Sequence, residues 1–214
     1  MKIKFVFNFM LLIILSGCGG GMPPIQYVSD APVGKDCSGA EILKSESCSG
    51  DELSAEEKKL IAIINHHREN KGLHAIEVSP NINKLANRHV QDLSKNMDLY
   101  LKDGKSWKHG WSDCPYDGKD DKTYKCMWEA PKRLGIAYPG YVFENLSTAS
   151  NGSTAEGAFS SWLGSKPHYR VIVNKGVWEE HRWNAIGVGI YGKYAVMIVG
   201  REVDPEANEG EMGK

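Results

Sequence analysis

The stretch WNAIGVGIYGKYAVMIVGRE, residues 183–202, predicts an antiparallel β-hairpin. In its first half, apolar residues alternate with Gly187 and Gly189, which is the two-residue period of a β-strand. Gly192 and Lys193 then form a two-residue turn, and the apolar run 194–199 supplies the second strand. The end of the chain therefore contributes at least one pair of strands to a sheet.

Two segments upstream of the hairpin carry strong helix signals. The first has Ser54 and Glu57 in capping-box spacing and ends at Gly72. Its apolar face is formed by Leu60, Ile61, Ile64 and the stem of Arg68. The second has Ser79 as N-cap and Pro80 at the first helical position. Its apolar stripe is formed by Ile82, Leu85, Ala86, His89, Leu93 and Met97.

A third helix is predicted where Ser153 and Glu156 repeat the capping-box spacing, and it ends near Gly164. Helices and strands do not alternate strictly, so we expect an α/β fold with a mixed or antiparallel sheet flanked by helices. The 214 residues, of which 41% are hydrophobic, suffice for one domain, predicted over 53–202. The acidic end, 203–214, lacks apolar anchors and is expected to be a disordered tail.

The first residues, MKIKFVFNFMLLIILSGC, are typical of an export signal. Two lysines precede an apolar run that is shorter than the about 20 residues of a transmembrane helix. The end of the run resembles the bacterial lipobox, which predicts a signal peptide over 1–17 and acylation of Cys18. The alternative is an ordinary signal peptide, with Cys18 lost or free. Residues 18–52, rich in Gly, Pro and Ser, are interpreted as a flexible tether.

The remaining four cysteines, an even number in an exported chain, indicate two disulfides. Four cysteines permit three connectivities, and the local pairs Cys37–Cys48 and Cys114–Cys126 are the simplest of them. A zinc site of four thiolates is the competing hypothesis, but none of these cysteines has the short spacing of such sites. The net charge of −1, with basic residues scattered among acids, gives no sign of a nucleic-acid surface.

Most of the histidines are interpreted as structural. His89 is expected to be a hydrogen-bonded core group, and four others are expected on the surface or in loops: His66, His67, His74 and His181. His109, Glu144 and His168 each adjoin an aromatic residue or a Gly/Pro breaker, so they are expected on loops or element ends, where functional groups are displayed. Two imidazoles and one carboxylate are a sufficient set of zinc ligands with one position open to water. Spacing alone makes this only a weak signal.

The same positions carry a family resemblance. In this order, the segments INHHRENKGL, SPNINKLANRHVQDL, HGW, FEN, WLGSKPHYRVIV and WNAIGVGI resemble the CAP superfamily of cysteine-rich secretory proteins, antigen 5 and pathogenesis-related proteins, with its bacterial SCP-domain members. The resemblance covers roughly residues 53–201. It implies a three-layer α/β/α sandwich with a central mixed or antiparallel sheet and a cleft at one end.

In animal and plant members that cleft carries two histidines and two glutamates, and some members bind divalent cations there. By resemblance, His109 matches the histidine of the HS element, Glu144 the glutamate of GEN, and His168 the histidine of GHYTQ. The second glutamate falls on Ser165. That departure removes a candidate general base or metal ligand.

These observations favour a binding module on a lipid anchor, whose cleft holds a small ligand or a divalent cation such as Zn²⁺. A metal-assisted hydrolase using His109, Glu144 and His168, and a lipid or sterol carrier, are the alternatives. Binding is favoured over catalysis because no serine or cysteine nucleophile has a recognisable motif around it. The expected location is the bacterial cell envelope, facing the periplasm or the cell surface. Gly19 after the lipidated cysteine favours the outer membrane in a Gram-negative source.

Overall fold

A computed structural model describes residues 34–96 and 108–207. The predicted signal peptide, Cys18 and the first part of the predicted tether, 18–33, lie outside the described residues, as do the last residues of the predicted tail, 208–214. None of the described helices is long and apolar enough to span a bilayer.

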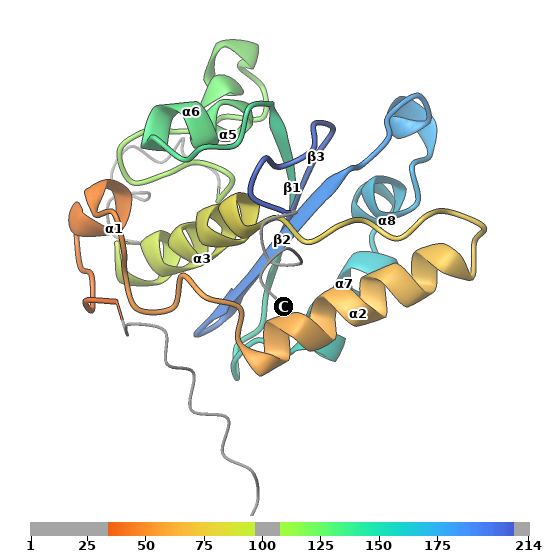
Figure 1. The fold of residues 1–214 in the computed structure, drawn as a ribbon, viewed down its shortest axis with the longest axis horizontal. Coiled ribbons are helices and arrows are strands. Elements are labelled where there is room, and N and C mark those ends of the chain that lie inside the picture. The colour runs from red at the N-terminus through yellow and green to blue at the C-terminus, as the bar shows by residue number, and fades with distance from the viewer. Residues whose placement is uncertain (1–33, 97–107, 208–214) are drawn as a thin grey trace, which may run out of the picture. The chain divides into compact units, whose positions relative to one another are not determined.

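Three antiparallel strands form the sheet of the described region, in the order β1-β3-β2 (Figure 1). They are β1 (Val142–Thr148), β2 (Ala185–Tyr191) and β3 (Tyr194–Gly200). Tyr191 lies opposite Tyr194 across the Gly192–Lys193 turn, so the predicted hairpin is confirmed with its register. The central strand β3 is buried along its whole length.

The two faces of β3 pack against different helices. Ala195, Met197 and Val199 belong to a core shared with α2 (Ala55–Glu69), α7 (Ala155–Leu163) and α8 (Lys166–Ile172). Tyr194, Val196 and Ile198 belong to a second core with α3 (Pro80–Lys95) and α6 (Ala130–Leu134). Because successive strand residues point to opposite faces, one apolar strand supports both cores. Figure 1 shows the sheet between these two groups of helices, which confirms the α/β/α sandwich.

Gly187 and Gly189 allow α3 to lie directly on β2. A Cβ atom at position 187 would overlap the backbone of Asn83, and one at position 189 the backbone of Ala86. The alternating glycines of the hairpin therefore form the surface on which the backbone of α3 packs. Such a close approach of two backbones requires residues without a side chain.

The helix starts follow the predicted capping signals, with one exception. Ser54 and Glu57 form the capping box of α2, and Ser79 caps α3 ahead of Pro80. In α7, however, the N-cap is Thr154, whose hydroxyl accepts from the backbone N–H of Gly157. The predicted cap Ser153 instead donates to the carbonyl of Lys193 at the hairpin turn, so that assignment was wrong by one residue.

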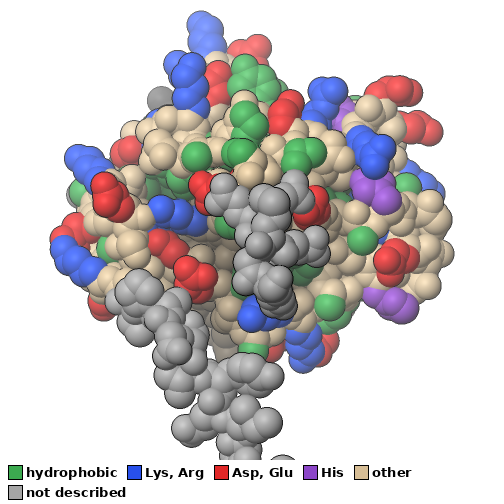
Figure 2. Space-filling view, in the orientation of Figure 1, with side chains coloured by type: hydrophobic (Ala, Val, Ile, Leu, Met, Phe, Trp, Pro, Cys, Tyr) green, Lys and Arg blue, Asp and Glu red, His purple; other side chains and the backbone are tan. Residues whose placement is uncertain are grey.

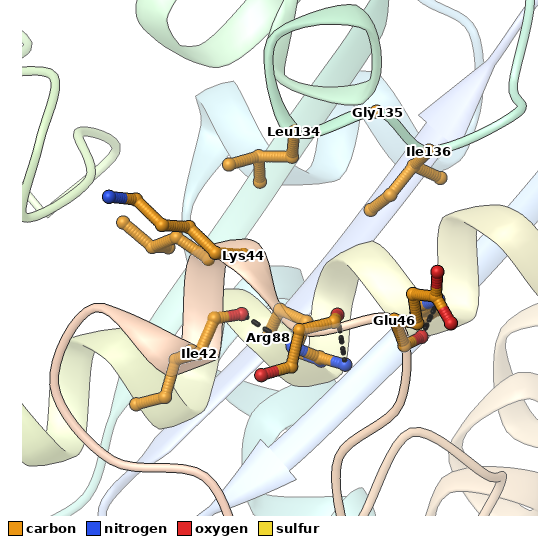
Figure 3. Close-up of a pocket in the computed structure, with 10 residues that line it drawn as sticks. Ile42, Lys44, Glu46, Arg88, Leu134, Gly135 and Ile136 are labelled. Carbon is orange, nitrogen blue, oxygen red and sulfur yellow. Dashed lines mark hydrogen bonds between the residues drawn. The ribbon is translucent and has the colours of Figure 1, made fainter.

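Residues 34–52, expected to belong to a flexible tether, instead pack on α3. The short helix α1 (Glu41–Lys44) lies within the loop closed by the Cys37–Cys48 disulfide, and both sulfur-bearing residues are buried. The guanidinium of Arg88, a buried residue of α3, donates to the carbonyls of Ile42 and Ser45 (Figure 3). It also pairs with the carboxylate of Asp51. The folded body therefore begins well before residue 53.

The start of the predicted acidic tail is also folded. Asp204 is 1% exposed, and its carboxylate accepts from the backbone and side-chain N–H groups of Asn81 at 3.0 and 2.9 Å. The hydroxyl of Ser79 donates to the same carboxylate. An acidic group at the first turn of α3 satisfies N–H groups that the helix leaves unpaired.

The second disulfide, Cys114–Cys126, joins a loop to the short helix α5 (Lys125–Trp128). Both predicted local pairings are thereby confirmed. Two 3₁₀ turns, η1 (Asp121–Thr123) and η2 (Gly176–Trp178), complete the described elements. On the face drawn in Figure 2, basic and acidic side chains are intermixed.

Candidate functional site

Glu144 is the third residue of β1, an edge strand of the described sheet. It shares the face of β1 that carries Val142 and Leu146, which pack in the α3 core. Its side chain is only 2% exposed. The expectation that this carboxylate lies on a loop or element end is therefore wrong, because Glu144 is inside a strand and buried.

His109 lies in the turn at residues 108–110 and contacts Glu144 directly. Its Nδ1 is 2.6 Å from Oε1 of Glu144, and its side chain is 26% exposed. A paired bridge between Trp111 and Cys114 and the disulfide of Cys114 hold this loop. Since a carboxylate accepts hydrogen bonds, Nδ1 carries a proton, and when the ring is neutral Nε2 presents its lone pair.

His89 completes the surroundings of Glu144. It is fully buried on α3, and its Nε2 lies 3.6 Å from Oε2 of Glu144 and 3.0 Å from the carbonyl oxygen of Lys108. Its ring meets the edge of Trp111 with centroids 4.4 Å apart. The sequence placed His89 in the core but missed its contact with the site. The sequence feature that could have indicated this contact is that His89 is a polar residue within an apolar stripe. A polar side chain that is buried needs a hydrogen-bond partner.

His168 approaches the site through the backbone. It lies in the first turn of α8, and its carbonyl oxygen accepts from the side-chain N–H of Asn145 at 2.9 Å. Asn145 follows Glu144 in β1 and is itself fully buried. Nδ1 of His168 is buried without a hydrogen-bond partner in the described part of the chain. The structure thus joins His109 to Glu144 directly, whereas the backbone of His168 is tied to Asn145, the neighbour of Glu144 in β1.

The pKa values of the imidazoles are shifted in opposite directions. For His109, burial lowers the pKa, but the hydrogen bond and the negative charge of Glu144 outweigh it and the net shift is upward. Burial lowers the pKa of His168, and the charge of His109 adds to that effect while Glu144 opposes it. Burial also lowers the pKa of His89. At neutral pH, His89 and His168 are therefore neutral rings.

Ser165, which occupies the position of the second glutamate of the resembled pattern, is the N-cap residue of α8. Its side chain makes no capping hydrogen bond. Within residues 34–96 and 108–207, no three His, Cys, Asp or Glu side chains are grouped closely enough to hold a metal ion. The carboxylate of Glu144 is already engaged by His109 and His89. The described residues therefore do not fit a zinc site with three protein ligands.

The sequence profile of the Cysteine-rich secretory protein family, CAP, matches residues 61–193. The chain belongs to this family. The matched range contains His89, His109, Glu144, Ser165 and His168, and so includes the whole site. By sequence alone, no curated protein matches the chain.

Solved structures of similar fold come from bacteria. An extracellular protein containing a SCP domain from Bacillus anthracis matches with a TM-score of 0.51 and 16% identity over 71% of this chain, which spans 45% of that protein. An outer surface protein of Borrelia burgdorferi has a TM-score of 0.49 and 15% identity, with 71% of this chain and 96% of that one covered. The Bacillus structure supports the CAP-domain fold and nothing beyond it. The present chain spans less than half the length of that protein.

Proposed function

We propose that this CAP-domain protein is exported, anchored by lipid at Cys18, and acts as a binding module whose ligand contacts His109 and His168. The observation that carries the proposal is the engagement of Glu144 with Nδ1 of His109 at 2.6 Å. A carboxylate on one ring nitrogen fixes the tautomer and orientation of an imidazole and leaves the other nitrogen for a ligand. Nε2 of His109 has no hydrogen-bond partner among the described residues.

His168 supports the same assignment. It carries a buried nitrogen without a described partner, and its pKa responds to the charges of His109 and Glu144. Two imidazoles close enough to influence each other's titration suit a hydrogen-bonding small ligand, or a divalent cation whose other positions are filled by water or by the ligand. Such a cation site is open and exchangeable, unlike a closed structural zinc site.

Zinc is a suitable probe for these two nitrogens. In calorimetric titration of the intact chain with Zn²⁺, we expect one binding event that is weakened about tenfold or more in His109→Ala and in His168→Ala. His66→Ala is the matched control, because His66 is an exposed histidine of α2 that bonds only to Asn70. If zinc does not bind at micromolar concentrations, or if all three variants bind equally, the cation part of the proposal is wrong.

Export and anchoring rest on separate observations. The two disulfides are of the kind that persists in oxidising compartments. The signal peptide and lipobox fall outside the described residues and are supported by the sequence. Cys18→Ser is expected to release the protein from the membrane fraction of its host, whereas Cys37→Ser leaves it membrane-bound. A wild-type chain found in the soluble fraction without detergent would contradict the anchor.

A metal-assisted hydrolase is the second candidate, and the His109–Glu144 pair is the observation that favours it. A carboxylate that orients an imidazole from behind is the usual support of a histidine that ligates a catalytic zinc ion. Peptide and ester hydrolysis by the zinc-loaded chain, abolished in His109→Ala, would favour catalysis over binding alone.

A further inference from the structure

The carboxylate of Glu144 lies between two imidazoles from different elements. Oε1 is 2.6 Å from Nδ1 of His109, and Oε2 is 3.6 Å from Nε2 of His89. The side chains of Glu144 and His89 are 2% and 0% exposed, so little water shares in these contacts. Each oxygen of the Glu144 carboxylate therefore lies against an imidazole: Oε1 against His109 and Oε2 against His89.

The hydrogen-bond partner of His89 defines its tautomer. Nε2 lies 3.0 Å from the carbonyl oxygen of Lys108, and a carbonyl oxygen can only accept. Nε2 therefore carries the proton, and its N–H donates to the Lys108 carbonyl. Oε2 of Glu144, at 3.6 Å from Nε2, packs against the ring beyond hydrogen-bond distance. Nδ1 of His89 is left buried without a described hydrogen-bond partner. This orphaned nitrogen is a cost that a purely apolar side chain at position 89 would avoid.

The hydrogen bond from His89 to Lys108 acts on the backbone next to His109. Lys108 immediately precedes His109, so the N–H of His89 restrains the backbone that leads into His109. The ring of His89 also packs against the carboxylate that bonds the ring of His109. The perpendicular packing of the His89 ring on the ring of Trp111 also restrains the plane of the His89 ring. Arg133 lies over the ring of Trp111 at 5.4 Å and braces it.

We infer that His89 is a positioning residue, whose Nε2–H holds the Lys108 carbonyl and whose ring packs against Glu144, so that His109 keeps its Nδ1–H tautomer and directs Nε2 outward. The inference rests on the proposed function only in that it concerns the same site. His89 itself does not touch the ligand, because it is buried behind Glu144 and the Lys108 backbone.

The alternative is that His89 only fills space in the α3 core. The two roles differ in what they require of a substitute: packing needs volume, whereas positioning needs an N–H donor at the place of Nε2. The amide nitrogen of a glutamine reaches about as far from the backbone as Nε2 of histidine. The amide of an asparagine ends near the position of Nδ1 and falls short of Lys108.

The test is the nitrogen-15 and proton NMR spectrum of the His109 ring in the intact chain, recorded without metal or ligand. The wild type is expected to show an Nδ1–H tautomer with a downfield proton signal from the bond to Glu144. His89→Leu and His89→Asn are expected to lose that signal and give mixed tautomers, while His89→Gln restores it. His67→Leu, which replaces a histidine packed against Phe159 on the other face of the sheet, leaves it unchanged.

A wild-type His109 spectrum in His89→Leu, even with a lowered melting temperature, would show that His89 serves packing alone. If His89→Leu does not fold, the comparison of Gln with Asn decides: equal His109 spectra in these two variants overturn the inference. Because the measurement needs no ligand, its outcome is separate from the zinc titration. If zinc does not bind but the spectra are as expected, the proposed cation site is wrong and the role of His89 still stands.

Discussion

His109 and Glu144 are 35 residues apart in the chain, yet Nδ1 of one lies 2.6 Å from Oε1 of the other. The strand β1 buries the carboxylate beneath α3, and the disulfide-linked loop brings the imidazole to it. A buried, charge-assisted hydrogen bond of this kind is strong, because water does not compete with it.

Glu144→Gln is expected to lower the pKa of His109, because the carboxylate supplies the hydrogen bond and the charge that raise it. With a folded pKa above the unfolded value, the pair stabilises the fold fully below about pH 6.5 and loses this contribution as the pH rises through the folded pKa. Wild type should therefore exceed Glu144→Gln by about 1.5–3 kcal/mol near pH 5 and by less near pH 9. Urea unfolding at both pH values measures this, and an equal difference at both would contradict it.

Gly187→Ala is expected to destabilise the fold by about 1–3 kcal/mol or more, because its Cβ would overlap the backbone of Asn83 on α3. Gly164→Ala is the control. Gly164 has ordinary helical backbone angles, and a Cβ atom there would meet no other atom closer than 3.6 Å, so its effect should stay within about 0.5 kcal/mol. Thermal or urea unfolding measures the stability change of each variant. Equal changes would show that α3 can move away from the added Cβ atom without loss of stability.

Arg88→Ala is expected to cost about 3–5 kcal/mol, because it leaves Asp51 without its buried partner and frees the carbonyls of Ile42 and Ser45. The segment around α1 should then become sensitive to limited proteolysis. Lys84→Ala, one turn earlier on α3, removes a more exposed contact to the carbonyl of Glu46 and should cost below about 1 kcal/mol. Unchanged proteolysis in Arg88→Ala would mean that the disulfide alone holds this segment.

Ser165→Glu is expected to tighten zinc binding by about tenfold, because it supplies a third ligand one turn before His168 on α8. Ser160→Glu, on the exposed surface of α7, controls for added negative charge. Calorimetry separates the two, and equal gains in both variants would indicate a general charge effect. The result bears on the proposed cation site rather than on the fold.

The sequence located most of the fold because its signals are local. The alternation in 183–202 predicted the hairpin and its turn, and Ser54 and Ser79 predicted two helix starts. The third cap was misplaced because Ser153 and Thr154 are both good caps, and the hairpin turn engages Ser153. Residues 34–52 have a linker-like composition, and their packing depends on Arg88 in a distant helix.

The family resemblance predicted that His109, Glu144 and His168 line one cleft. In the structure, His109 and Glu144 are in direct contact. The resemblance did not predict His89 or Asn145 as their supports, because those contacts depend on which face of α3 and β1 each residue occupies.

The sequence by itself determined the C-terminal hairpin, the helices α2, α3 and α7, the likeness to CAP proteins and the parity of the cysteines. Each of these rests on residues near one another or on order along the chain. Only the tertiary structure decided that Glu144 is buried between His89 and His109, that Asp204 caps α3, and that Gly187 and Gly189 admit a helix backbone. The physical reason is that burial and hydrogen bonding between distant residues are set by how the layers pack, and no local pattern encodes that packing.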